Sequence, residues 1–232
     1  MRYFSQRPPL AVALALTLPL FLLYQIGVLL VPTASGADLV TAALLKMVGG
    51  SLPLYLGALA SVAGLIALAV VLSGHHKRMT PGLLLPVLLE SGIYALTMGT
   101  LILFVMAEVM GFPLPLLAGR AMGPAEKIVL SLGAGFHEEL LFRLLLFAGL
   151  AAAGTRLFAL PALWAGLAAA AVSSALFALA HHVGPLGDPL RLDVFVYRFL
   201  AGGFFAALFK WRGFAVAAYT HALYDLYVLL LR

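Results

Sequence analysis

Long apolar runs alternate along the chain with short polar or Gly- and Pro-rich connections. About seven runs are long enough to cross a hydrocarbon core of about 30 Å as helices. They cover Leu10–Val31, Leu52–Ser73, Pro81–Met110, Lys127–Ala153, Ala162–His182, Leu192–Trp211 and Gly213–Leu231. Lipid leaves backbone groups without water, so only helices or closed barrels span it, and these runs are too long for barrel strands. The pattern predicts one all-α integral-membrane domain over residues 1–232, a polytopic bundle of about seven transmembrane helices.

The run Leu39–Val48 is too short to cross the bilayer, so we expect an interfacial or partly inserted helix that ends at Gly49 and Gly50. The first long run has a competing interpretation as a signal peptide, which the small residues Ala34–Ala37 favour. Its apolar length exceeds the 7–15 residues of a typical signal-peptide core. We therefore expect a retained first helix.

Composition supports this class of protein. Hydrophobic residues make up 64% of the chain and charged residues 10%, against about 25% charged in soluble domains. Mean hydropathy is +1.10. The chain has no cysteine, which excludes disulfides and thiolate metal sites. The formal net charge of +5 comes mainly from basic residues at span ends, where the positive-inside rule explains them. We therefore expect a lipid bilayer as the surroundings and no nucleic-acid partner.

The basic residues also predict an orientation. An amino terminus inside the cell places a larger basic set inside than outside. The inside set is Arg2, Arg7, Lys77, Arg78, Arg156, Lys210 and Arg212, and the outside set is Lys46, Arg120, Lys127, Arg191 and Arg232. This weak excess favours a cytoplasmic amino terminus.

One stretch, Gly135–Arg143, puts four ionisable side chains into an otherwise apolar run. Each charge inside a membrane costs about 2.5–3.5 kcal/mol, so such residues indicate a functional site. Glu139 and Arg143 are four residues apart and share a helix face, so they can pair. Glu138 then points to another face without a local cation. A carboxyl in low dielectric beside a second carboxylate is suited to take and return protons.

Histidines in two other spans reach a compatible depth. Glu138 lies about 16 Å below Lys127, and His221 about 12 Å above Gly213, at 1.5 Å per residue. Both values place the two groups near the middle of the bilayer. His181 is expected nearer the outer surface, at the mouth of a cavity. Asp225 follows His221 by four residues and shares its face, so it could orient the imidazole or project into the cavity beside it.

Several polar residues have a simpler structural interpretation. We expect His137 and His182 to be interhelical hydrogen bonders, and the pair of Glu139 and Arg143 to be structural. Glu90 is expected to support a buried polar network, and Glu108 to be wet near a helix end. The connection Gly111–Lys127, rich in Pro and Gly, could act as a lid or access loop.

Three segments, Glu138-Glu139-x-x-x-Arg143, Phe177-x-x-x-His181 and His221-x-x-x-Asp225, resemble in order and spacing the motifs of the CPBP family. That family includes the CAAX prenyl endopeptidases of the Rce1 type and many bacterial Abi proteins. The resemblance covers a catalytic core at about residues 127–227.

By this resemblance, the protein would be an intramembrane endopeptidase. Glu138, with His181, would activate a water molecule, and His221 with Asp225 would stabilise the oxyanion. Glu139, Arg143 and Phe177 would be supporting residues. The eukaryotic-type branch has asparagine where this chain has Asp225. Because a carboxylate is a poor oxyanion donor unless protonated, a role in orienting His221 stays open.

Three of these residues could also bind a metal cofactor. Glu138, His181 and His221 form a two-His, one-Glu set of the kind that suits zinc. The chain lacks an H-E-x-x-H motif, and these residues also suffice for general base catalysis without a metal. We expect no cofactor, with zinc as the alternative.

The resemblance implies a membrane-anchored or exported protein or peptide as substrate, processed at carboxy-terminal anchors or sorting signals in a bacterial inner membrane. A proton-coupled transporter with a relay through Glu90, Glu138 and Asp225 is an alternative, although it predicts inverted repeats that the chain does not show. A non-catalytic immunity or partner protein is another alternative. The sequence carries no signal for an oligomeric state.

Overall fold

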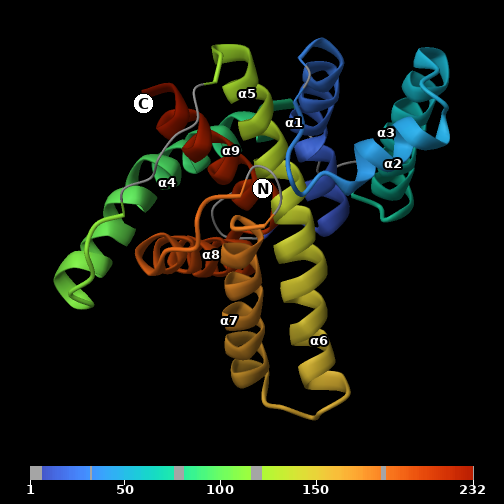
Figure 1. Ribbon diagram of the computed structural model, residues 1–232. Helices are drawn as coiled ribbons and strands as arrows, with labels where there is room; N and C mark the ends of the chain where they lie inside the picture. Colours follow the sequence, from blue (N-terminus) through green and yellow to red (C-terminus); the bar gives the residue numbers. More distant parts are fainter. Residues whose placement is uncertain (1–6, 32, 76–80, 116–121, 184–186, 232) are drawn as a thin grey trace.

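The computed structural model describes residues 7–31, 33–75, 81–115, 122–183 and 187–231. All regular elements in these ranges are helices (Figure 1). In chain order they are α1 Leu10–Leu30, α2 Leu39–Met47, α3 Leu52–Leu72, η3 Pro81–Leu83, α4 Leu84–Phe104, η4 Val105–Val109, α5 Pro124–Gly133, η5 Ala134–Phe147, α6 Ala148–Arg156, α7 Ala162–Ala180, α8 Leu192–Arg212 and α9 Phe214–Leu231.

Six helical segments of the described chain are long and apolar enough to cross a membrane. They are α1, α3, α4 with η4, α7, α8 and α9. The expected span Lys127–Ala153 also forms a helical segment, continuous from Pro124 to Arg156, but it carries the charged stretch and is not among the six. The predicted all-helical, multi-pass membrane architecture is confirmed.

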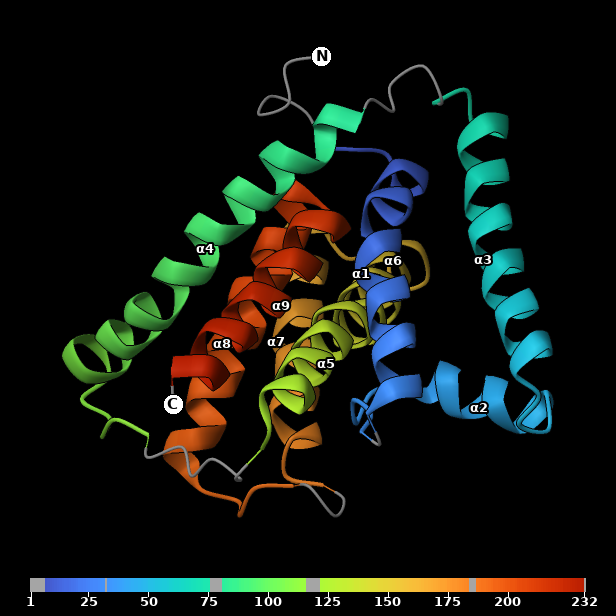
Figure 2. The same cartoon turned by 90° about the horizontal axis from the view of Figure 1, so that it is seen from above.

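Helix α9 lies at the centre of the bundle. It contacts α4 on one side and η5, α5, α1 and α8 on the others. Figure 2 shows α9 between α4 and α1, with α3 at the far edge. The first half of α9 is rich in alanines, and Ala215, Ala217, Ala218 and Ala222 are all buried. Small residues let membrane helices approach closely, which is why this segment can be surrounded.

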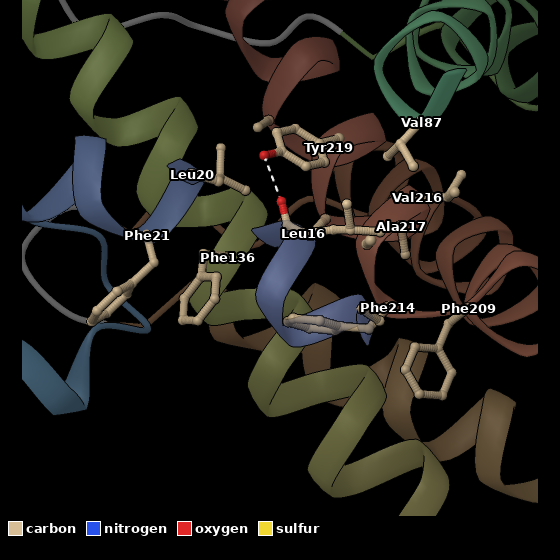
Figure 3. Close-up of a cluster of buried hydrophobic side chains, with 14 of the residues drawn as sticks. Leu16, Leu20, Phe21, Val87, Phe136, Phe209, Phe214, Val216, Ala217 and Tyr219 are labelled. Atoms are coloured by element: carbon tan, nitrogen blue, oxygen red, sulfur yellow. Dashed lines mark hydrogen bonds between the residues drawn. The ribbon is translucent and has the colours of Figure 1, made fainter. Parts of the chain in front are cut away.

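An aromatic cluster joins α1, η5 and α9 (Figure 3). The rings of Phe21 and Phe136 are 4.9 Å apart, and those of Phe136 and Phe214 are 5.9 Å apart in an edge-to-face arrangement. The Tyr219 hydroxyl donates a hydrogen bond of 2.9 Å to the carbonyl oxygen of Leu16. The first helix is therefore packed into the same core as the last one.

Helix α2 is the short helix expected after the first span. Asp38 caps it by accepting a hydrogen bond of 2.8 Å from the backbone N–H of Thr41. The chain turns after the helix at Gly49 and Gly50, which have φ angles of +59° and +75°. Glycine adopts this left-handed region without steric cost, so the turn ends α2 where the sequence predicted.

A buried ion pair links α4 to α8. Arg212 binds Glu90 through two contacts, Nε to Oε1 at 2.6 Å and Nη2 to Oε2 at 2.9 Å, and Tyr94 donates to the same carboxylate at 3.2 Å. Glu90 thus supports a buried polar network, as expected. Arg212 lies at the end of its span, as expected, but its side chain is only 3% exposed because it pairs with Glu90 inside the bundle.

Some expectations fall on residues that the structure does not describe. The proposed lid or access loop, 111–127, includes 116–121. Five of the basic residues used for the orientation also lie outside the described residues, namely Arg2, Lys77, Arg78, Arg120 and Arg232. Glu108, which is described, is exposed as expected.

The π-helical segment η5 approaches α9 through Gly135. A Cβ atom at this position would lie 2.6 Å from the carbonyl oxygen of Ala218 and 2.6 Å from the Cβ of Ala222. Real Cβ atoms do not come so close, so only glycine fits here without separating the two helices. Gly149, in α6, has no such neighbour within 4 Å.

We expect Gly135→Ala to destabilise the protein by about 1–3 kcal/mol, because the added methyl overpacks the contact between η5 and α9. The matched variant Gly149→Ala should be neutral or stabilising by up to about 1 kcal/mol, since alanine favours helix and meets open space. Thermal unfolding of the detergent-purified variants measures the difference. Equal unfolding temperatures for the two variants would contradict the close contact.

Candidate active site

The structure brings together the four predicted catalytic side chains from three helical segments. Glu138 lies in η5, His181 directly follows α7, and His221 and Asp225 lie in α9. Glu138 Oε2 lies 3.6 Å from His181 Nε2 and 3.9 Å from His221 Nε2. Asp225 Oδ2 lies 3.6 Å from His221 Nε2. One carboxylate therefore faces two imidazoles, with a second carboxylate beside one of them.

Glu138 is the residue around which the others gather. Its side chain is 12% exposed, and its Oε2 is buried without a direct hydrogen bond. Both imidazole nitrogens lie more than 3.5 Å from this oxygen, so neither forms a direct hydrogen bond with it. A water molecule bound between Glu138 and an imidazole would satisfy this oxygen and would stand where a general base can deprotonate it.

His221 is held by Glu139 rather than by Asp225. Its Nδ1 lies 2.9 Å from Glu139 Oε1, in hydrogen-bonding range, while Nε2 faces Glu138 and Asp225. The ring stacks on Phe205 with a centroid distance of 4.5 Å. A carboxylate on Nδ1 fixes which nitrogen is presented to a ligand, so Glu139 orients the Nε2 atom toward Glu138.

Arg143 compensates the charge of Glu139. Its Nε lies 3.2 Å from Glu139 Oε2, which is the pairing that the four-residue spacing predicted, and both side chains are fully buried. The guanidinium also lies over the ring of Phe177, 4.3 Å from its centroid. Cation–π contact at this distance stabilises a desolvated arginine. Phe177 therefore supports the site from α7, since its ring lies 4.8 Å from His181 as well.

His181 lies at the more open edge of the site. Its side chain is 27% exposed, compared with 4% for His221. Its Nδ1 lies 2.8 Å from the carbonyl oxygen of Phe177, which leaves Nε2 toward Glu138. The backbone N–H of Asp188 donates to the His181 carbonyl oxygen at 2.9 Å, and Arg198 forms an ion pair with the Asp188 side chain. These contacts hold the residue after α7 against α8.

His137, the neighbour of Glu138, belongs to a separate buried network that we call the Asp38 cluster. Its members are Tyr24, Gln25, Asp38, Thr41, Tyr55 and His137. Asp38 lies at its centre, with Oδ2 accepting from the Tyr24 hydroxyl at 2.6 Å and Oδ1 lying 3.3 Å from His137 Nε2. The expected interhelical hydrogen bond of His137 is not formed: Nδ1 lies 3.1 Å from the carbonyl oxygen of Gly133 one turn earlier, and Nε2 approaches Asp38 without a hydrogen bond.

Sequence reasoning missed three contributors to the site. The contact of Glu139 with His221 was missed because the four-residue spacing from Glu139 to Arg143 already explained why Glu139 is there. Phe205 lies on α8, and its spacing in the sequence gives no sign that it stacks on a histidine of α9. Arg198 donates to the His181 carbonyl oxygen at 3.4 Å, a long-range contact that no local pattern encodes.

The donors offered for zinc are not arranged as a ligand set. Among the residues that the structure describes, no group of three or more His, Cys, Asp or Glu side chains is arranged so that it could hold a metal ion. The Nε2 atoms of His181 and His221 lie 3.6 and 3.9 Å from Glu138 Oε2, compared with roughly 3.4 Å between neighbouring ligand atoms around a tetrahedral zinc ion.

We expect Arg143→Ala to lower the abundance of the folded protein, because Glu139 would keep a buried charge without its cation. Breaking a buried ion pair from one side typically costs about 3–5 kcal/mol. The matched variant Arg156→Ala removes an exposed arginine at the end of α6 and should leave abundance unchanged. Quantitative immunoblotting of membranes compares the two. Normal abundance of Arg143→Ala would refute its structural role.

The part of the chain that carries these residues matches a known protein family. Residues 122–227 match the family described as Type II CAAX prenyl endopeptidase Rce1-like, and this range contains all the motif residues. No curated protein and no solved structure matches the chain. Residues 122–227 are thus similar to the Rce1-like type II CAAX prenyl endopeptidases.

Proposed function

We propose that the protein is an intramembrane endopeptidase in which Glu138 and His181 activate water, and His221 and Asp225 stabilise the oxyanion. The observation that carries the proposal is the position of one buried carboxylate oxygen between two imidazoles, at 3.6 and 3.9 Å. The match of residues 122–227 to a family of proteases is a second support.

The reaction uses this chain's own residues as follows. Glu138 takes a proton from the water molecule while the water oxygen attacks the carbonyl carbon of the substrate peptide bond. His181, which presents Nε2 on the same side, orients the water. The tetrahedral intermediate then collapses with cleavage of the carbon–nitrogen bond, and Glu138 returns its proton to the leaving nitrogen. The products are a new carboxyl terminus and a new amino terminus.

The oxyanion would form on the side of His221. Glu139 holds Nδ1 of this ring, so the other nitrogen can donate to the developing charge when it carries a proton. Asp225 lies 3.6 Å from the same nitrogen and is 29% exposed. In its protonated form Asp225 adds a second donor. The sequence left open that Asp225 orients the His221 ring. We propose that Glu139 orients it instead.

We propose the metal-free version of this chemistry. The arrangement of Glu138, His181 and His221 is that of a general base with two imidazole neighbours, and we route no step through zinc. The charge that a metal would supply comes instead from His221, the most buried of the three side chains.

The proposed substrates are membrane-anchored or exported proteins and peptides, cleaved near carboxy-terminal anchors or sorting signals. The protein is a multi-pass membrane protein, and we propose a bacterial inner membrane, where spanning proteins are helical. The more exposed edge of the site at His181 would face outward under the orientation that the basic residues favour. A reporter fused to the carboxy terminus tests this topology.

A proton-coupled carrier is less well supported. Its relay required Glu90 alongside Glu138 and Asp225. Glu90 is bound by Arg212 through both oxygens, on the α4–α8 contact, and so serves a structural pair. A non-catalytic partner protein would have no need for the geometry around Glu138.

We expect Glu138→Gln to abolish cleavage while leaving abundance normal, because the amide keeps the shape of the side chain and loses the base. Loss of a general base typically costs about 10²- to 10⁴-fold in rate. Mass spectrometry of the carboxy termini of membrane proteins, in cells with and without the active protein, measures the effect. The exposed Glu108→Gln is the matched control and should behave as the native chain. If the carboxy termini are the same in cells with the native protein, with Glu138→Gln and without the protein, the hydrolase proposal is wrong.

Asp225 is tested by two further variants. We expect Asp225→Asn to keep activity within about tenfold, because the amide is a neutral donor at the same position. Asp225→Ala should lose about 10²- to 10³-fold, since one oxyanion donor disappears. Rates on a substrate found in the preceding comparison distinguish the two. If Asn and Ala lose activity equally, Asp225 acts through its charge and not as a donor.

A further inference from the structure

One residue of the proposed site, His181, lies outside the helices. Glu138 lies within η5 and His221 within α9, so helical hydrogen bonds hold their backbones on both sides. His181 directly follows α7. The last carbonyl groups of a helix have no partner within that helix, and helix ends fray. The position of His181 therefore depends on contacts from outside α7.

The imidazole of His181 is oriented by α7. Its Nδ1 lies 2.8 Å from the carbonyl oxygen of Phe177, one turn earlier. A carbonyl oxygen only accepts hydrogen bonds, so this contact assigns the hydrogen to Nδ1, and Nε2 of the neutral ring is then an acceptor. Nε2 is the atom that faces Glu138 Oε2, at 3.6 Å. This tautomer suits a ring that accepts one hydrogen of the attacking water while Glu138 removes the other.

Arg198 of α8 binds the connection between α7 and α8 at two points. Its Nη1 donates a hydrogen bond of 3.4 Å to the carbonyl oxygen of His181. Its Nη2 forms an ion pair with the carboxylate of Asp188. The backbone N–H of Asp188 donates to the same His181 carbonyl oxygen at 2.9 Å. The carbonyl oxygen that follows α7 thus receives two donors, and Arg198 holds both of the residues involved.

The described parts of this connection also pack against each other. His182 Nδ1 lies 3.0 Å from the carbonyl oxygen of Asp188. Gly187 approaches the backbone of His182 closely, since a Cβ there would lie 2.8 Å from the His182 carbonyl carbon. These contacts tie Asp188 to the end of α7. Because Arg198 lies within α8, its pairing with Asp188 attaches this end to a rigid helix.

The charge of Arg198 also acts on the catalytic groups directly. Arg198 interacts electrostatically with Glu138, His181 and Asp225. Its side chain is 18% exposed and lies at the same open edge of the site as His181. A cation near the carboxyl end of a helix interacts favourably with the carbonyl groups there. Arg198 therefore belongs to the surroundings of the site as well as to the connection.

We propose that Arg198 is a positioning residue for hydrolysis, which together with Asp188 fixes the backbone of His181 so that the ring presents Nε2 to the attacking water beside Glu138. This inference rests on the proposed endopeptidase function. Arg198 acts through His181 in this role and touches neither the water nor the substrate. A displacement of about 1 Å at a reacting group can cost about 10²-fold in rate, so a contact one step away from the chemistry is enough to control it.

The first test observes the His181 ring and does not require cleavage. The protein is labelled with ¹³C,¹⁵N-histidine and studied by NMR in detergent micelles, and the His181 signals are those missing from His181→Gln. Ring shifts distinguish the two neutral tautomers from the doubly protonated ring. We expect one set of signals with the hydrogen on Nδ1. Arg198→Ala should broaden this set or add a second one, because the released end of α7 samples other positions.

Arg191→Ala is the matched control. Arg191 lies in the same connection and pairs with Asp193, with Nη2 2.7 Å from Oδ2. The variant therefore removes an arginine of the same kind that does not bind the His181 carbonyl. Its side chain is 49% exposed, and such a pair contributes little to stability. The His181 signals of Arg191→Ala should be those of the native protein, and Arg198→Lys, which keeps a donor and a charge, should retain most of the native set.

The second test measures kcat and KM on a substrate found by the comparison of carboxy termini. We expect Arg198→Ala to lower kcat by about 10- to 100-fold with KM changed less than about threefold, because the substrate still binds and the water is misplaced. Arg191→Ala should change neither value. Arg198→Lys should recover a large part of the lost kcat. If Arg198→Ala does not fold, Asp188→Asn replaces it in both tests and should show smaller changes of the same kind.

Three results would overturn the positioning role and leave the hydrolase standing. They are His181 signals that Arg198→Ala does not change, a native ring with hydrogen on Nε2, and a native kcat in Arg198→Ala. Carboxy termini that do not respond to Glu138→Gln would instead reject the hydrolase, and with it the role of Arg198 in the reaction, whatever the spectra show.

Discussion

Glu139 bridges Arg143 and His221, and the geometry of the site depends on this bridge. One carboxylate oxygen lies 3.2 Å from the guanidinium within η5, and the other lies 2.9 Å from the imidazole of α9. All three groups are almost completely buried, so each would be strongly destabilised if it lost its partner. The bridge therefore fixes the distance between η5 and α9. Glu138 and His221 face one another across that same distance.

The two adjacent glutamates receive different roles from the helix that carries them. Successive residues point in different directions around a helix, so Glu138 and Glu139 cannot share one set of neighbours. Glu139 has a cation 3.2 Å from one oxygen and an imidazole 2.9 Å from the other. Glu138 points toward imidazole nitrogens that lie beyond hydrogen-bonding distance. The paired carboxylate builds the site, and the carboxylate with room beside it is the one that can exchange a proton.

Sequence patterns predicted this fold well because the bilayer limits the choices. The length of the apolar runs predicted the membrane helices, and Gly49 and Gly50 predicted the end of α2. The four-residue spacing gave the pair of Glu139 and Arg143, since local spacing determines which side chains share a face. Contacts between distant helices were not accessible in this way. The pairing of Arg212 with Glu90 was missed because the two residues lie on different helices, and Phe205 was missed because stacking on His221 depends on how α8 and α9 pack.

The amino-terminal half lies outside the family match, yet α1 and the Asp38 cluster pack against the helical segment that carries Glu138. His137 and Glu138 are neighbours that face away from each other, the first into the Asp38 cluster and the second into the site. Gly133 allows Tyr24 to pack directly against the same helix, since a Cβ there would lie 2.4 Å from the tyrosine ring. A helix packed against α1, the Asp38 cluster and α9 has little freedom to rotate, and rotation is what would move Glu138 away from His181 and His221. The amino-terminal helices therefore contribute to the precision of a site to which they supply none of the proposed catalytic residues.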